Sequence, residues 1–185
     1  MTRLQRLTCT AGRVAWMASC WLLAGCAGNT AQDFEIVGVS KYEAASAFSP
    51  QGHSVAGLPN GVYRITAVGS TTTPPERVEK IALARAAEYG VELKKKAFAQ
   101  QRVAQSVRCG ETSILQKGEK VPVRPADYRV VALDVTYGDQ VNEPALRATK
   151  ATAETLKAEL AAESVPADQQ KALASEIAQA CNRKG

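Results

Sequence analysis

The chain has 185 residues, 45% of them hydrophobic and 22% charged, with a formal net charge of +5. This length suits a single domain. Three of its arginines fall within residues 1–13, and without them 20 basic residues face 18 acidic ones. A balance this close to neutral does not indicate a nucleic-acid-binding protein. The sequence contains no internal repeat and no long low-complexity segment.

The first 25 residues have the three parts of a secretory signal peptide. Residues 1–13 are basic and lack acids, residues 14–23 are apolar and uncharged, and Ala24 and Gly25 are small. The apolar run is too short for a permanent membrane-spanning helix, which needs about 20 residues. We therefore expect the chain to be exported and residues 1–25 to be removed.

The end of this segment, Leu23-Ala24-Gly25-Cys26, resembles the lipobox of bacterial lipoproteins. The resemblance implies cleavage between Gly25 and Cys26, a diacylglycerol on the Cys26 thiol and usually an N-acyl chain. More than one chain matters, because a single acyl chain binds membranes only marginally. Ala27 follows where some lipoproteins have Asp, which by the sorting rule of enteric bacteria favours an outer-membrane protein facing the periplasm. The alternatives are a plain signal peptide with an incidental cysteine and an uncleaved anchor.

Residues 26–61 are expected to form the lipidated N-terminus and a flexible tether. The segment is rich in Gly, Ser, Ala, Asn and Gln, and it contains several turn-forming pairs. A short strand over residues 34–39 is an alternative for part of it. His53, the single histidine of the chain, lies in this segment and is interpreted as a solvated loop residue. The folded domain is accordingly predicted over residues 62–185.

The first predicted strand covers residues 62–69, in which apolar and polar side chains alternate. A helix is predicted to follow, because Thr73-Pro74-Pro75-Glu76 fits a capping box with Thr73 as the N-cap and Pro74 in the first helical position. Apolar residues at helical spacing continue the helix to an end between residues 90 and 98.

The stretch from Tyr63 to about Phe98, which contains YRITAVG…TPPERVEKIALARAAEYG, resembles a group of small proteobacterial envelope lipoproteins. In this group a Tyr-Arg-hydrophobic strand precedes a Thr/Pro-capped helix that contains Arg-Ala-Ala-Glu. The resemblance covers about a fifth of the chain, its motif is mostly structural, and it implies no catalytic residues. The sequence departs from the group at residues 93–101, LKKKAFAQQ, where a Gly-rich turn is expected.

The rest of the chain completes the order β-α-β-β-α-α. Strands are predicted over residues 101–109 and 128–137, with a loop or hairpin between them, and Ala-rich helices over residues 143–164 and 166–182. This order predicts an α+β fold, with a three- or four-stranded antiparallel or mixed sheet covered by helices. The last two helices are expected to cover the sheet or each other, and the alternative is that they bind a partner helix.

Two cysteines remain in the mature domain once the signal is removed and Cys26 is lipidated. Cys109 extends the alternating set Val103 and Val107 on its strand, and Cys181 extends the apolar stripe of the last helix, so both are expected on inward faces. In an oxidising compartment the pair predicts a disulfide. The bridge would close a loop of about 70 residues and contribute about 2–4 kcal/mol. Two separate buried thiols are the alternative.

Candidate catalytic groups are few. Asp134 with Asp139 or Glu143 could supply an acid and a base, as in glycoside hydrolysis, although surface solvation and the charge of a helix N-terminus explain these residues better. His53 lacks the Ser or Cys and the acid of a triad, and one histidine with two distant cysteines does not predict zinc. Neither Gly-rich phosphate-binding motif is present. We therefore predict no catalytic residue, no metal and no cofactor.

Lys94, Lys95 and Lys96 form the densest basic run. They are a candidate anion site for lipid headgroups or cell-wall carboxylates. The alternative is a charged helix end, where lysine favours the helix dipole and where Glu88 and Glu92 weaken the local field.

Together these features predict a non-enzymatic envelope lipoprotein, held in the membrane by the lipid on Cys26. Its expected role is structural or adaptor-like, with an envelope protein as its partner and no nucleic acid. The alternative functions are an envelope hydrolase that uses carboxylates and an anion- or stress-sensing module.

Overall fold

The computed structural model describes residues 38–46, 49–140 and 146–183, which belong to one folded unit, Glu35–Gly185. The predicted signal peptide, residues 1–25, and the predicted lipidation site, Cys26, lie outside the described residues. Most of the alternative strand over residues 34–39 also lies outside them.

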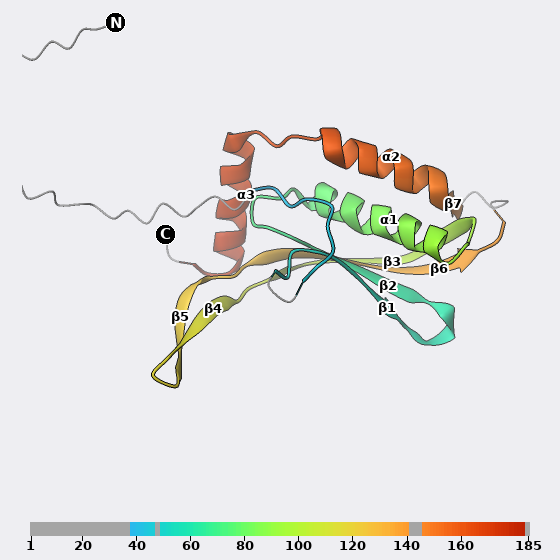
Figure 1. The fold of residues 1–185 in the computed structure, drawn as a ribbon. Coiled ribbons are helices and arrows are strands. Elements are labelled where there is room, and N and C mark those ends of the chain that lie inside the picture. Colours follow the sequence, from blue (N-terminus) through green and yellow to red (C-terminus); the bar gives the residue numbers. More distant parts are fainter. Residues whose placement is uncertain (1–37, 47–48, 141–145, 184–185) are drawn as a thin grey trace, which may run out of the picture. The chain divides into compact units, whose positions relative to one another are not determined.

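A five-stranded antiparallel sheet underlies the fold, in the order β1-β2-β6-β3-β7 (Figure 1). The α+β class is confirmed, although this sheet has more strands than the three or four predicted. Its strands are β1 (Gly52–Gly57), β2 (Tyr63–Gly69), β3 (Ala97–Arg108), β6 (Tyr128–Gly138) and β7 (Leu146–Ala148). The other elements are the hairpin strands β4 (Glu111–Gln116) and β5 (Glu119–Pro125), the 3-10 turn Pro59–Gly61, and the helices α1 (Pro75–Glu92), α2 (Thr149–Ala162) and α3 (Ala167–Ala180).

The core lies between the sheet and α1. On β2 and β6 the alternate side chains Ile65, Ala67, Leu133 and Val135 are fully buried. The residues between them face the opposite side of the sheet, because successive side chains of a strand alternate between its faces. The predicted alternation on both strands is therefore confirmed.

The helix α1 is buried on two sides, because the sheet lies below it and α2 lies above it (Figure 1). Apolar residues all round a helix are typical of such a position. Gly90 permits the close approach at its C-terminal end. A Cβ atom there would lie 2.5 Å from Cγ2 of Thr149 and 2.8 Å from Cε1 of Tyr137.

The predicted capping box is wrong. α1 begins at Pro75 with Pro74 as its N-cap, and no side chain caps it by a hydrogen bond. Thr73 is instead fully buried, and its Oγ1 accepts a hydrogen bond from the backbone N–H of Ser40 at 2.9 Å. The same Oγ1 lies 2.7 Å from Oγ of Ser70. The Thr73 hydroxyl, which the local pattern assigned to the helix cap, thus makes a tertiary hydrogen bond to a residue 33 positions away.

The folded region begins well before residue 62, the predicted boundary between tether and domain. β1 lies inside the predicted tether and pairs along its length with β2. Ser40 fastens the chain further upstream: its Oγ accepts a hydrogen bond from the N–H of Ser70 at 2.8 Å, and its carbonyl accepts one from Nε of Arg77 at 3.1 Å. Within the described residues, the chain is therefore part of the fold from Gly38 onward.

The strand β3 starts earlier than predicted and is much more exposed. The expectation that Val103 and Val107 point into the core is wrong, since they are 39% and 37% exposed. Val103 does share its face with the buried Leu133, its partner in register. The helices leave this part of the face uncovered. The alternation therefore predicted the correct face of the sheet for Val103, but not its exposure.

The C-terminal segment predicted as one helix over residues 143–164 is divided between β7 and α2. Thr149, Ala153 and Leu160 are buried, and α2 packs mainly against α1, whereas the prediction placed this helix on the sheet or on the last helix. α3 matches the predicted range 166–182 and lies beside the N-terminal end of α1 (Figure 1).

Candidate functional site

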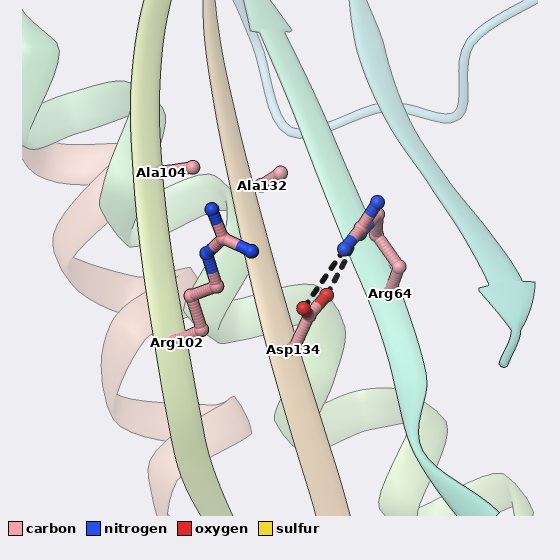
Figure 2. Close-up of a pocket in the computed structure, with 5 residues that line it drawn as sticks. All are labelled: Arg64, Arg102, Ala104, Ala132 and Asp134. Carbon is pink, nitrogen blue, oxygen red and sulfur yellow. Dashed lines mark hydrogen bonds and ion pairs between the residues drawn. The ribbon is translucent and has the colours of Figure 1, made fainter. Parts of the chain in front are cut away.

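The candidate carboxylates do not form an acid–base pair. Both oxygens of Asp134 accept hydrogen bonds from Arg64, at 2.7 and 2.9 Å (Figure 2). The hydrogen bond from Arg64 holds the pKa of Asp134 below its ordinary value. Asp139 has its own partner, because Nζ of Lys95 donates to it at 3.0 Å. Glu143 lies outside the described residues.

A shallow depression of about 130 Å³ surrounds this ion pair on the face of the sheet away from the helices (Figure 2). Its other lining residues are Arg102, Ala104 and Ala132. The positive charge of Arg102 also lowers the pKa of Asp134, although less than Arg64 does. The depression therefore has two arginines and one aspartate, and its net charge is positive.

The lysine run does not present three charges together. Lys94 has a positive φ of 58°, which turns the chain at the end of α1. Lys95 is paired with Asp139, and the N–H of Lys96 donates to the carbonyl of Gly138. One of the three charges is thus neutralised locally, which weakens the case for an anion site here.

His53 is neither a loop residue nor solvated, which corrects the prediction. It belongs to β1, is only 9% exposed, and its ring centroid lies 4.7 Å from that of Tyr42. Burial, followed by the charge of Arg85, lowers the pKa of His53. A neutral, packed histidine is consistent with a structural role.

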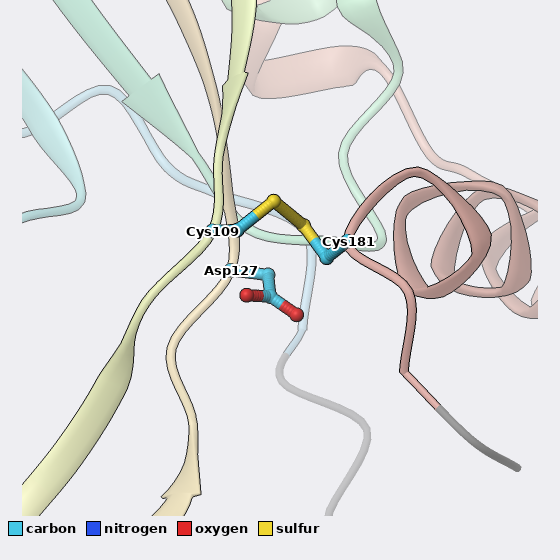
Figure 3. A group of neighbouring side chains, drawn as sticks. All are labelled: Cys109, Asp127 and Cys181. Carbon is cyan, nitrogen blue, oxygen red and sulfur yellow. A yellow bond between two sulfur atoms is a disulfide. The ribbon is translucent and has the colours of Figure 1, made fainter.

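The predicted cysteine pair is brought together at disulfide distance. The sulfur atoms of Cys109 and Cys181 are 2.05 Å apart, across a sequence separation of 72 residues (Figure 3). Cys109 is nevertheless exposed and Cys181 only half-buried, so the expectation of two inward-facing thiols is wrong. The bridge ties the end of α3 to the end of β3.

An ionic clamp lies beside this bridge. Asp127 is 8% exposed, and its carboxylate accepts hydrogen bonds from Nη2 and Nε of Arg183 at 2.8 and 3.1 Å. The hydrogen bond from Arg183 lowers the pKa of Asp127. The sulfur atoms of Cys109 and Cys181 and a carboxylate oxygen of Asp127, which are possible metal ligands, lie within 4.8 Å of one another. Two sulfurs bonded to each other provide no thiolate, which is the form of cysteine that binds metals.

One edge of β3 is open over most of its length. β6 pairs with one side of the strand, whereas β7 covers the other side only at residues 97–99. In the described part of the chain no strand pairs with that side over residues 100–108, and the side chains of residues 101–108 are all exposed. An edge of this kind presents unpaired backbone N–H and C=O groups.

A cleft of about 210 Å³ opens beside this edge, on the helix side of the sheet. It lies between β3, β6 and the first residue of α1, and it is lined by Pro75, Gln105, Ser106, Val107, Arg129, Val130 and Val131. The side chain of Arg129 is only 9% exposed, and its Nη2 donates to Glu176 at 3.0 Å. Its Nε is buried and has no hydrogen-bond partner. The alternation on β6 places Arg129 on the same face as Leu133, yet a charged residue near the start of the strand was not recognised as buried.

Comparison with family models, with curated proteins and with solved structures finds no match to the chain. Among the described helices, none combines the length and the apolar character that a membrane crossing requires.

Proposed function

We propose that the protein is a lipid-anchored envelope adaptor that binds an extended segment of a partner protein along the open edge of β3. The observation that carries this proposal is the unpaired edge at residues 100–108, which lies next to exposed valines. A peptide that adds a strand to such an edge gains backbone hydrogen bonds, and it takes its specificity from alternate side chains.

The charge on β3 favours an acidic partner over a second copy of the chain. Arg102 and Arg108 are its charged residues, and it has no acid. An antiparallel β3–β3 dimer centred on Gln105 would place Arg102 of each copy opposite Arg108 of the other. Like charges directly opposite each other destabilise a strand pair. An acidic segment would instead place its negative charges beside the two positive arginines.

The geometry of the anchor agrees with a role near the membrane surface. Gly38, where the described fold begins, lies 12 positions after Cys26. A fully extended chain of that length spans at most about 43 Å. If Cys26 is acylated, the β3 edge can reach only partners close to the same membrane.

The hydrolase alternative loses its main support in the pairing of Asp134. A general acid needs a pKa that is raised toward neutrality. Arg64 acts in the opposite direction, because it stabilises the ionised carboxylate of Asp134.

The edge contact is tested by co-purification from the native host after mild detergent extraction. Val103→Glu with Val107→Glu should remove a partner that the wild-type protein retains, because the added carboxylates repel an acidic incoming segment. Ala56→Glu, at an exposed position of β1 on the opposite edge, is the matched control and should retain the partner. Equal recovery with all three proteins would contradict the proposal.

The anchor is tested separately. Globomycin, which inhibits the lipoprotein signal peptidase, should cause the precursor to accumulate, and the mature protein should begin at an acylated Cys26. Normal maturation in the presence of the drug, or an unmodified Cys26, would overturn the membrane attachment while leaving the β3 edge proposal open to its own test.

A further inference from the structure

The cleft beside β3 contains a charged group that the fold does not fully satisfy. A buried polar atom without a partner costs free energy, and such atoms are rare in native proteins. Nε of Arg129 is such an atom, although Glu176 binds the other end of the guanidinium. Glu176 binds the guanidinium through Nη2, which is only one edge of the arginine. Glu176 is itself 65% exposed.

The surroundings of Arg129 indicate what could complete its hydrogen bonds. Val107 is its cross-strand neighbour in register, and Pro75 brings the N-terminal end of α1 to the same cleft. The positive end of a helix dipole favours a negative charge. The cleft holds several water-sized volumes, each about 10–15 Å³. A short carboxylate side chain therefore fits the space and the charge.

The cleft adjoins the edge where we place the partner strand. Gln105, Ser106 and Val107 line the cleft. They also belong to residues 100–108, where the side of β3 away from β6 has no strand partner. Every second side chain of an added strand would point to the helix side of the sheet, where Arg129 lies. Specificity for one side chain would then come from the cleft, and general affinity from the backbone.

We propose that this cleft is a carboxylate subsite, in which an Asp or Glu side chain of the bound segment accepts a hydrogen bond from the guanidinium of Arg129, which the fold leaves without a partner for one of its N–H groups. This assignment rests on the proposed binding of an extended segment to β3. It adds a fixed acidic position in the partner, set opposite Val107, to the general preference for acidic segments that Arg102 and Arg108 create.

The test uses the full-length protein in detergent and random decapeptides displayed on phage. The peptides are joined to the coat protein at their carboxyl end, so that only a side chain can supply the carboxylate. Selected peptides should share one acidic position. Changing that acid to its amide should weaken binding about tenfold, as expected for the loss of one charge-assisted hydrogen bond.

A double-mutant cycle then assigns the contact to Arg129. In Arg129→Gln the change from acid to amide in the peptide should have no further effect. Arg108→Gln is the control, because Arg108 lies on the opposite face of β3, and there the tenfold loss should remain. An equal loss in all three proteins would overturn the subsite.

A second variant avoids disturbing the buried arginine. Val107→Glu places a carboxylate on the exposed cross-strand neighbour of Arg129, where it should occupy the subsite and abolish the preference for acid, whereas Val107→Gln should keep it. A retained preference in Val107→Glu would contradict the subsite.

The proposed function fails by a different result. N-methyl groups at alternate peptide positions block backbone pairing and should abolish binding. Peptides that bind equally well when methylated, or a selection that enriches no peptide, would overturn strand addition at β3 itself. Peptides that need their backbone N–H groups but share no acid would overturn the carboxylate subsite alone.

Discussion

Two regions of the molecule are held together by different forces. The core region consists of α1, α2, β2 and residues 128–138 of β6, and the peripheral region consists of residues 101–127 together with α3 and residues 181–183. Among the side chains whose burial is described, nearly all buried apolar ones lie in or beside the core region, and Ile177 alone lies in the peripheral region. The peripheral region is instead held by the pairing of residues 102–108 with β6, by the Cys109–Cys181 bridge and by Arg183.

The difference teaches how this fold can keep an open strand edge. Apolar burial stabilises the core region without help from β3 beyond Ala97 and Phe98. The exposed part of β3 is held by β6 on one side and by a covalent bond at its far end, so its other side can stay without a covering strand. A local opening of the peripheral region should therefore cost less than unfolding the core.

The largest effect is expected from Phe98→Ala, in the part of β3 that reaches the core. Phe98 is fully buried, and its ring packs near that of Tyr137. Its truncation should lower the free energy of unfolding by about 3–5 kcal/mol. Val103→Ala, on the exposed part of the same strand, is the control and should change it by less than about 0.5 kcal/mol. Urea denaturation measures both, and similar losses would remove the distinction between the regions.

The second effect is that of the bridge. Cys109→Ser with Cys181→Ser should lower stability by about 2–4 kcal/mol, because the unfolded chain loses its constraint. Hydrogen exchange should locate the change: amides of α3 and of residues 101–108 should exchange faster, while those of α1 should keep their relative order of protection. An intact mass that does not rise by two hydrogens on reduction would show that the bridge is absent.

The third effect sharpens the description of the core as tightly packed. Gly90→Ala raises helix propensity, yet its Cβ would meet Thr149 and Tyr137. We expect a net loss of about 1–3 kcal/mol from overpacking. Adding Thr149→Ser removes the nearest methyl group and should recover part of the loss. A stabilised Gly90→Ala would mean that α1 and α2 are further apart than described.

The smallest effect concerns the clamp in the peripheral region. The pKa of Asp127 is lowered in the fold, so its pairing with Arg183 contributes stability above the ordinary carboxyl value of 3.8 and loses that contribution as the pH falls below it. Arg183→Gln should therefore lower stability by about 1 kcal/mol near pH 7 and by less near pH 3. Thermal melts across this pH range test the sign, and a difference that grew at low pH would contradict it.

Sequence patterns predicted the elements in which apolar side chains recur at a regular spacing. β2, β6 and α1 follow their periodicities closely, and the hairpin of β4 and β5 is one of the two forms expected for residues 110–127. β1 was missed because its stability comes from pairing with β2, and its own sequence, GHSVAG, is short and mixed in character.

The candidate site was harder to predict, because it depends on part of β3 lacking a covering helix and a second paired strand. Periodicity identifies the face of Val103 but contains no information on whether a helix lies over it. Arg129 was missed for a similar reason: its burial follows from the position of α3 and from Glu176, which is 47 residues away in the chain. The cysteine pair could be anticipated from count and compartment, whereas the exposure of Cys109 could not.

The most direct test of the account is photocrosslinking in intact cells of the native host. A photoreactive amino acid at position 103 or 107 of β3 should give a defined adduct with one envelope protein, and the crosslinked peptide should come from an extended acidic segment. The same amino acid at position 56 of β1 should give no such adduct. Identical adducts from both edges of the sheet, or none from β3, would contradict the claim that this edge is where the protein meets its partner.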